Sequence, residues 1–167
     1  MLFSFAKPVL LALQLITSPF SEPAGPITPP VTISHAEQAC MAEAVFHEAR
    51  GLPEDEMIYV ANVVNNRVAS DLFPNTVCKV VYQKSQFSWT AHKPNTKRIV
   101  SRNAAEKASW EQANRVATMA VAGQLPDRTM GALWYHTKHV SPSWSRSKKM
   151  KRVPVDHTSP HLFYSRR

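Results

Sequence analysis

The sequence has no uninterrupted apolar run of 18 residues and no internal repeat. The first absence argues against a permanent membrane span, which needs about 20 consecutive apolar residues. Cysteine is also scarce, because Cys40 and Cys78 are the only two in the chain. The chain nevertheless holds 167 residues with an ordinary hydrophobic fraction of 44%. It therefore has room for one folded domain with its own hydrophobic core.

Acidic residues are few: 12 Asp and Glu stand against 20 Lys and Arg, which gives a formal net charge of +8. This excess predicts attraction to anionic partners, namely nucleic acid, anionic lipid, or the glycans and teichoic acids of a bacterial wall. Many basic residues lie late in the chain, at Arg146, Lys148, Lys149, Lys151, Arg152, Arg166 and Arg167. The alternative interpretation of this basic run is an ordinary solvated surface.

The amino-terminal residues are similar to a secretion signal. Lys7 precedes an apolar run from Pro8 to Ile16, and small residues follow without a clean Ala-x-Ala cleavage site. We expect residues 1–18 to be a signal-like segment, or an uncleaved anchor that associates transiently with a membrane. Five prolines within residues 19–34 indicate an extended linker. The folded domain is then expected to cover residues 35–167.

Export would give the two cysteines a structural use. In an oxidising compartment Cys40 and Cys78 can form one bridge. It would close a loop of about 39 residues and stabilise the fold by roughly 4 kcal/mol on the chain-entropy estimate. We predict this disulfide, which would hold the turn before Cys78 against the helix that carries Cys40.

Periodicity, caps and turn residues predict a mostly helical chain. Ser34 and Glu37 have the spacing of a capping box, and Gly51 is a suitable residue to follow the end of that first helix. The acids just after Pro53 would complement the dipole of a second helix. The predicted elements are helices over residues 34–50 and 53–68, a turn over 71–78, a short helix near 80–82, a flexible loop over 90–103, a helix over 104–122 and a strand over 131–136. The remainder is expected to be irregular.

Glu48 is the unusual residue of the first predicted helix. Winding the helix at about 100° per residue places Glu48 on the apolar face that carries Met41, Ala44 and Val45. A carboxylate that faces the core is desolvated, and the negative end of the helix dipole lies nearby. Both effects raise a pKa and favour the protonated form, as a general acid requires. The alternative is a helix-end glutamate paired with an arginine.

Several segments, in this order, resemble the SleB-type cell wall hydrolase family, which includes spore cortex-lytic enzymes. The resemblance covers about residues 37–164. The matching segments are Glu48–Gly51, Val60–Val68, Phe73–Cys78, Val80–Gln83, Gln86–Trp89, Gly131–Ala132, Tyr135–His136, Val140–Trp144 and the closing His161-x-Phe163-Tyr164.

This resemblance implies a mainly α, lysozyme-like single domain, α+β with a minor short sheet, that cleaves the glycan strand of peptidoglycan. It also implies that Glu48 is the catalytic acid, in agreement with the helical-face argument. Two positions depart from the family pattern. Leu52 stands where the family has a second glutamate, so the role of that glutamate is lost or moved to Glu54. Ser159 stands where the family has glycine, which suggests an altered final turn.

Two reaction outcomes remain open for such an enzyme. A hydrolase normally uses a second carboxylate, and only Asp71, Asp127 and Asp156 are loose candidates. A lytic transglycosylase needs a single glutamate, first as acid and then as base toward the muramic 6-hydroxyl. The absence of a second motif-borne carboxylate favours the transglycosylase. The sugar cleft is expected to be lined by Gln86, Ser88, Trp89, Tyr135 and His136, although core packing is the alternative for Trp89 and Tyr135.

Other classes of function have weaker support. The pairs His136/His139 and His157/His161 have spacings that a zinc amidase or endopeptidase could use, but no His-Glu-x-x-His motif exists. A non-catalytic wall-binding or nucleic-acid-binding module would explain the charge but not a core-facing Glu48. We therefore expect an exported monomer of the periplasm, envelope or extracellular space, or a phage protein released to the wall. Its partner would be peptidoglycan, with no cofactor, no metal and no specific nucleic acid.

Overall fold

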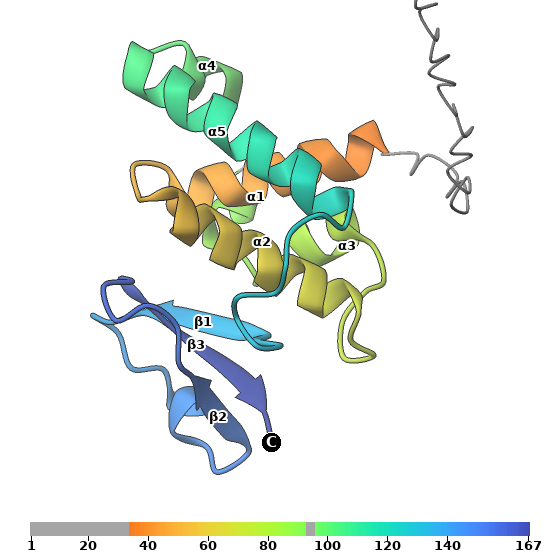
Figure 1. Cartoon of the computed structure of the whole chain (residues 1–167), viewed down its shortest axis with the longest axis vertical. Helices are drawn as coiled ribbons and strands as arrows, with labels where there is room; N and C mark the ends of the chain where they lie inside the picture. The colour runs from red at the N-terminus through yellow and green to blue at the C-terminus, as the bar shows by residue number, and fades with distance from the viewer. Residues whose placement is uncertain (1–33, 93–95) are drawn as a thin grey trace, which may run out of the picture. The chain divides into compact units, whose positions relative to one another are not determined.

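The computed structural model describes residues 34–92 and 96–167. The predicted signal-like segment 1–18 and all but the last residue of the linker 19–34 lie outside the described residues. The helices are α1 (His35–Ala49), α2 (Glu54–Val68), α3 (Val77–Val81), α4 (Thr96–Val100) and α5 (Ala104–Val121); the 3-10 turns are η1 (Ser88–Ala91) and η2 (Ser143–Arg146); the strands are β1 (Trp134–Thr137), β2 (Met150–Val153) and β3 (His161–Arg166). Within the described ranges no helix is long and apolar enough to cross a membrane. The expected mainly α fold with a minor sheet is confirmed (Figure 1).

Helix α1 begins and ends close to where the sequence places its caps. The Ser34 hydroxyl accepts a hydrogen bond from the Glu37 backbone N–H, and Gly51 follows the helix with a φ of 79°. The reciprocal half of the capping box is replaced by a tertiary contact. The Glu37 carboxylate accepts the backbone N–H of Cys78 at 3.2 Å, so it caps the start of α3 instead of its own helix.

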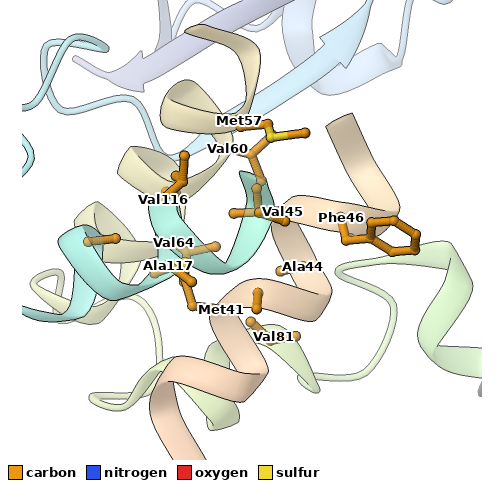
Figure 2. Packing of buried hydrophobic residues seen from close by; sticks show 14 of the residues in the cluster. Met41, Ala44, Val45, Phe46, Met57, Val60, Val64, Val81, Val116 and Ala117 are labelled. Carbon is orange, nitrogen blue, oxygen red and sulfur yellow. The ribbon is translucent and has the colours of Figure 1, made fainter. Parts of the chain in front are cut away.

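The main core lies where α1, α2, α3 and α5 pack together (Figure 2). Met41, Ala44 and Val45 of α1 are fully buried, as the helical-face argument predicts. They pack in one cluster with residues of the other helices, among them Val60, Val64, Val81, Val116 and Ala117. The face of α1 that carries Glu48 is therefore the face that the other helices cover.

Polar residues on α2 hold the segment that follows α5. Asn62 bonds to the Pro126 carbonyl and the Arg128 N–H, and Asn65 donates to the Ala120 carbonyl. Asn66 donates to Asp127, Thr129 and the Ala132 carbonyl. These bonds fix the chain just before β1, which carries Tyr135 and His136.

The sheet is antiparallel, with strand order β1-β3-β2. Phe163 of the central strand pairs with Tyr135 on one side and Val153 on the other. The expected strand over 131–136 is present as β1, but it begins at Trp134 and residues 131–133 are not part of it. The expectation that the rest is irregular is wrong. Strand β2 is missed because it is only four residues long and exposes its two central charged side chains. Strand β3 contains the closing His161-x-Phe163-Tyr164 motif of the family resemblance. Its buried Phe163 joins Tyr59 and Val63 of α2 in a second core cluster.

The predicted flexible loop over residues 90–103 contains helix α4, so this prediction is wrong for the described residues 96–100. Ile99 and Val100 pack against the main core, which stabilises the short helix through tertiary contacts. The buried Thr96 hydroxyl lies 3.0 Å from the His47 ring and donates to Glu43. Residues 93–95 lie outside the described part of the chain.

The predicted disulfide is present. Cys40 on α1 and Cys78 on α3 are joined, with their Cα atoms 5.2 Å apart. Together with the Glu37 cap, the bridge attaches the Phe73–Cys78 turn to the helix that carries Glu48.

Candidate functional site

A cavity of about 1280 Å³ opens between the helices and the sheet. Glu48 from α1 and Arg67 from α2 contribute to its lining, and Tyr135 and His161 face it from the sheet. Its remaining lining residues come mostly from the segment 82–91, which follows α3 and includes η1. The site is therefore assembled from elements that are distant in the sequence.

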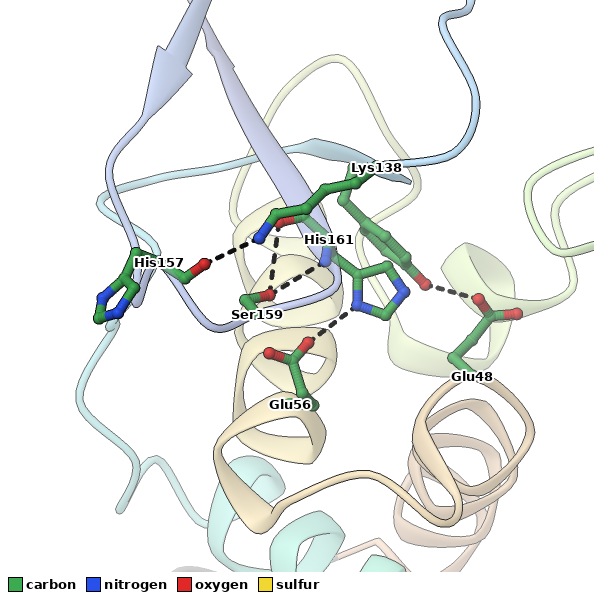
Figure 3. Close-up of polar contacts among 7 residues, drawn as sticks. Glu48, Glu56, Lys138, His157, Ser159 and His161 are labelled. Carbon is green, nitrogen blue, oxygen red and sulfur yellow. Dashed lines mark hydrogen bonds and ion pairs between the residues drawn. The ribbon is translucent and has the colours of Figure 1, made fainter.

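Glu48 occupies the last turn of α1 and is partly buried. The Tyr135 hydroxyl donates a hydrogen bond to its Oε2 at 2.9 Å (Figure 3). Burial raises the pKa of the Glu48 carboxyl above its ordinary value, and this effect outweighs the hydrogen bond from Tyr135. The charges of His161 and Arg67 and the indole of Trp89 also act against the rise in pKa. Glu48 thus lies among groups that can stabilise either protonation state.

The alternative of a Glu48–Arg pair finds no support in the described residues. Arg50, the arginine nearest in sequence, lies 3.8 Å from Glu106 of α5 instead. The donor that contacts Glu48 is a neutral phenol. Burial and the adjacent carboxylate raise the pKa of Tyr135 well above its ordinary value, so this hydroxyl keeps its proton.

Four of the five predicted cleft residues line the cavity. These are Gln86, Ser88, Tyr135 and His136. Trp89 is not among the lining residues: it packs against the helical core and stacks on His47, with ring centroids 4.5 Å apart. Its buried indole N–H has no hydrogen-bond partner within the described part of the chain, although the indole influences the pKa of Glu48. Contact of any of these side chains with substrate stays a prediction.

Glu56 and His161 form a buried pair next to the cavity. His161 Nδ1 lies 2.8 Å from Glu56 Oε2, and both side chains are almost fully covered. Figure 3 shows the His161 imidazole between the side chains of Glu56 and Glu48. Glu56 is one of the acids after Pro53 that are expected only to complement the helix dipole, so this pair is not predicted from the sequence. Winding α2 would have placed Glu56 and Arg67 on the buried face with Val60 and Val63.

The loose candidates for a second carboxylate do not reach the cavity. Asp71 is exposed, and Asp156 accepts the backbone N–H and hydroxyl of Thr158. Partial burial alone would raise the pKa of Asp127, but hydrogen bonds from Thr129, Gly131 and Asn66 lower it overall. Among the described residues, Glu48 is the carboxylate that lines this cavity.

The two departures from the family pattern have local explanations. Leu52 packs against the helical core. Glu54 accepts a hydrogen bond from Gln112 on the surface, so it does not bring a second carboxylate into the cavity. The Ser159 hydroxyl accepts the backbone N–H of His161 at 3.1 Å, which braces the turn before β3 (Figure 3).

The histidine pairs proposed for zinc have other contacts. His136 bonds to the Tyr164 hydroxyl and His161 to Glu56, while His139 and His157 are exposed. The described ranges contain no group of three or more His, Cys, Asp or Glu side chains arranged to hold a metal ion.

Comparison with known proteins gives a consistent result. The spore cortex-lytic enzyme of Bacillus subtilis (strain 168) is 37% identical over 62 residues, which are 37% of this chain and 20% of that protein. The spore cortex-lytic enzyme of Halalkalibacterium halodurans is 31% identical over 127 residues, which are 74% of this chain and 34% of that protein. The matches thus span about a fifth to a third of these relatives' length.

Two solved structures resemble this one. The catalytic domain of the Bacillus cereus SleB protein superposes with a TM-score of 0.60 and 28% identity, over 85% of this chain and 99% of that one. The catalytic domain of a germination-specific lytic transglycosylase SleB from Bacillus anthracis gives the same score and identity, over 83% of this chain and 100% of that one. The model of the family described as Cell Wall Hydrolase matches residues 51–164, beginning just after Glu48. Since this match covers more than half of the sequence, the chain belongs to the Cell Wall Hydrolase family.

Proposed function

We propose that this protein degrades peptidoglycan by cleaving its glycan strand between N-acetylmuramic acid and N-acetylglucosamine, with Glu48 as the general acid and base. The observation that carries the proposal is a carboxyl with a raised pKa in a cavity large enough for a sugar chain. Membership of the Cell Wall Hydrolase family and the likeness to spore cortex-lytic enzymes support the same substrate.

The first chemical step uses the protonated form of Glu48. Glu48 gives its proton to the glycosidic oxygen, and the bond between that oxygen and the muramic C1 breaks as positive charge develops on the ring. The raised pKa keeps the proton available to a higher pH than an exposed glutamate would.

We favour the lytic transglycosylase outcome for the second step. Glu48, now a carboxylate, takes the proton of the muramic 6-hydroxyl while that oxygen bonds to C1, which gives a 1,6-anhydro end and regenerates the acid. The support is that Glu48 is the carboxylate lining the cavity in the described residues. The solved relative from Bacillus anthracis is named as a lytic transglycosylase.

Substrate contacts are assigned to the cavity residues Gln86, Ser88, Tyr135 and His136. Amide and hydroxyl groups would bond the N-acetyl and ring oxygens, and the aromatic faces would pack on pyranose rings. Trp89 is assigned a different part, because it packs against the helical core and its indole acts on the pKa of Glu48.

Action on peptidoglycan implies export, and we propose that residues 1–18 direct or anchor the protein outside the cytoplasm. The Cys40–Cys78 disulfide agrees with an oxidising compartment. We propose that the protein acts as a monomer and binds the wall through its positive charge.

The test of the proposed function is Glu48→Gln, with Glu54→Gln as the matched control on the surface. Glu48→Gln is expected to abolish lysis of purified peptidoglycan, because glutamine keeps the volume but has no proton to give. Glu54→Gln should lyse it normally. Mass spectrometry of the released muropeptides then separates the outcomes, since anhydro ends are one water lighter than reducing ends. Normal lysis by Glu48→Gln would refute the assignment, and loss of lysis on treatment with a chelator would favour the zinc amidase.

Folding of Glu48→Gln serves as the check on this experiment. The pKa of Glu48 is raised in the folded protein. The Glu48 side chain therefore stabilises the fold fully below its unfolded pKa of about 4.3. This stabilisation is lost as the pH rises through the pKa of Glu48 in the folded protein. Glutamine removes this loss. At pH 7 the thermal midpoint of the variant should therefore equal or slightly exceed that of the wild type. At pH 4 the midpoint of the variant should not exceed that of the wild type.

A further inference from the structure

Arg67 of α2 is a buried cation that has no ion-pair partner among the residues that the structure describes. Its side chain is 4% exposed, yet it contributes to the lining of the cavity that contains Glu48. Its Nε donates to the Leu133 carbonyl at 2.8 Å, and its guanidinium carbon lies 5.1 Å from the Phe73 ring centre and 5.6 Å from that of Phe87. These contacts hold the guanidinium in place without neutralising its charge.

Two observations show that this charge is incompletely compensated. The buried Nη1 of Arg67 has no hydrogen-bond partner, and no acid in residues 34–92 or 96–167 forms an ion pair with it. A buried, unpaired cation is costly to the fold. The acidic groups that influence it are Tyr135 and Glu48, which share its cavity. The guanidinium therefore acts electrostatically on the Glu48 end of the cavity.

We propose that Arg67 is the fixed counter-charge that stabilises the Glu48 carboxylate after Glu48 has given its proton to the glycosidic oxygen. This inference rests on the proposed function and adds to it a positioning residue, Arg67, whose charge acts on Glu48. Arg67 acts through Glu48 across the cavity and does not touch the reacting atoms.

The separation between the two groups has a physical consequence. A direct ion pair with Arg67 would hold Glu48 ionised at rest and would prevent it from acting as an acid. At a longer distance, burial still favours the protonated form, while the cation reduces the free energy of the carboxylate that forms in the first step. Such an arrangement suits one glutamate that must serve as acid and then as base.

The other groups near Glu48 come from every element packed around it. Tyr135 on β1 donates a hydrogen bond, and His161 on β3 faces Glu48 with its Nδ1 held by Glu56 of α2. Trp89 on η1 contributes its indole. On α1 itself, Glu43 does not line the cavity and bonds instead to Tyr82 and Thr96. Arg67 carries a positive charge that does not depend on pH near neutrality.

The experiment compares Arg67→Met with Arg67→Lys, with Arg128→Met as the matched control. Arg128 also lies over an aromatic ring, 5.4 Å from the Tyr59 centroid, but it pairs with Asp55 and does not line the cavity. The Glu48 side-chain carbon is titrated by NMR in each variant and assigned by its absence in Glu48→Gln. In parallel, lysis of purified peptidoglycan is measured against pH.

Arg67→Met should raise the Glu48 pKa by about one unit, because removal of a nearby positive charge disfavours the carboxylate. The alkaline limb of the lysis profile should move up by the same amount, and the maximal rate should fall. Arg67→Lys should keep the Glu48 pKa within a few tenths of the wild-type value, and Arg128→Met should change neither readout. If Arg67→Met does not fold, Arg67→Gln, which keeps a donor for the Leu133 carbonyl, replaces it with the same expected shift.

An unchanged Glu48 pKa in the folded neutral variant would overturn the inference. Equal shifts in the neutral variant and in Arg67→Lys would also overturn it, because they would show an effect of packing and not of charge. The titration needs no turnover, so it also separates the two proposals. A shifted Glu48 pKa in a protein that does not cleave glycan would sustain the electrostatic coupling and refute the proposed function.

Discussion

At the scale of single residues, the site depends on how strongly each neighbour of Glu48 favours its charged form. Burial favours the neutral acid, and the Tyr135 hydroxyl opposes it through a hydrogen bond of 2.9 Å. Because the Tyr135 hydroxyl remains protonated, it can donate this hydrogen bond to Glu48 across the whole working pH range. The Tyr135 hydroxyl is therefore expected to influence the pH profile of Glu48, whereas the Tyr135 ring influences packing.

Tyr135→Phe isolates the hydroxyl. Loss of the hydrogen bond should raise the Glu48 pKa further, by about one unit, since a hydrogen bond to a charged group contributes about 1.5–3 kcal/mol. The alkaline limb of the lysis profile should move to higher pH, and the maximal rate should fall about tenfold because the carboxylate of the second step loses a donor. The measurement is lysis of purified peptidoglycan between pH 4 and 9. A profile that keeps its wild-type alkaline limb would show that this hydrogen bond does not set the pKa of Glu48.

At the scale of secondary-structure elements, two long-range ties place the helix that carries Glu48 and the sheet. The Glu56–His161 pair connects the first turn of α2 to the start of β3, and the Cys40–Cys78 bridge connects α1 to α3. Both ties lie within one or two turns of residues that line the cavity. Their removal should affect stability as well as the geometry of the site.

Glu56→Ala should reduce the free energy of unfolding by about 3 kcal/mol or more, because it leaves the buried His161 ring without its partner. Glu54→Ala is the matched control from the same helical turn. It removes only a surface contact with Gln112 and should cost less than about 1 kcal/mol. Urea unfolding followed by circular dichroism measures both variants. Equal losses would show that the buried pair contributes no more than a surface contact.

Reduction of the disulfide should lower the free energy of unfolding by roughly 4 kcal/mol on the chain-entropy estimate. The oxidised protein should show no reactive thiol, and reductant should shift its urea midpoint downward. The Cys40→Ala/Cys78→Ala variant should unfold at the lower midpoint with or without reductant. Two titratable thiols in protein exported by its native host would contradict the bridge.

At the scale of the whole molecule, the basic run and the cavity that contains Glu48 lie in different places. Lys148, Lys149, Lys151 and Arg152 are exposed on β2 and the turn before it, and none of them lines the cavity that contains Glu48. The net charge of +8 favours accumulation on an anionic wall. The basic run is therefore expected to determine binding to the wall, and the cavity to determine turnover.

Neutral replacement of these four residues should weaken co-sedimentation with purified walls and flatten its dependence on salt. The reason is that the Debye length falls from about 10 Å at 0.1 M salt to about 3 Å at 1 M, so only charge-driven binding is lost at high salt. Turnover of short soluble glycan fragments should change little, because they require no attraction to a large polyanion. Loss of fragment turnover as complete as that of Glu48→Gln would place the basic run in the active cleft.

Local sequence alone determined the features that depend on neighbours within a few residues. The periodicity of α1 placed Glu48 on the buried face, and Ser34 and Gly51 marked its ends. These signals are strong because side-chain spacing and caps are properties of one helix. The resemblance supplied the family, four of the predicted cleft residues reached the cavity, and the disulfide formed as expected.

Only the tertiary structure decided which distant groups meet. Glu37 caps α3 and not its own helix, Glu56 pairs with His161 across 105 positions, and Arg67 bonds to Leu133 across 66. Strand β3 becomes the centre of the sheet because β1 and β2 pair with it from either side. Each of these outcomes depends on burial and on partners that no local pattern specifies. Burial also gives Glu48 its raised pKa, because the elements that cover it come from both ends of the domain.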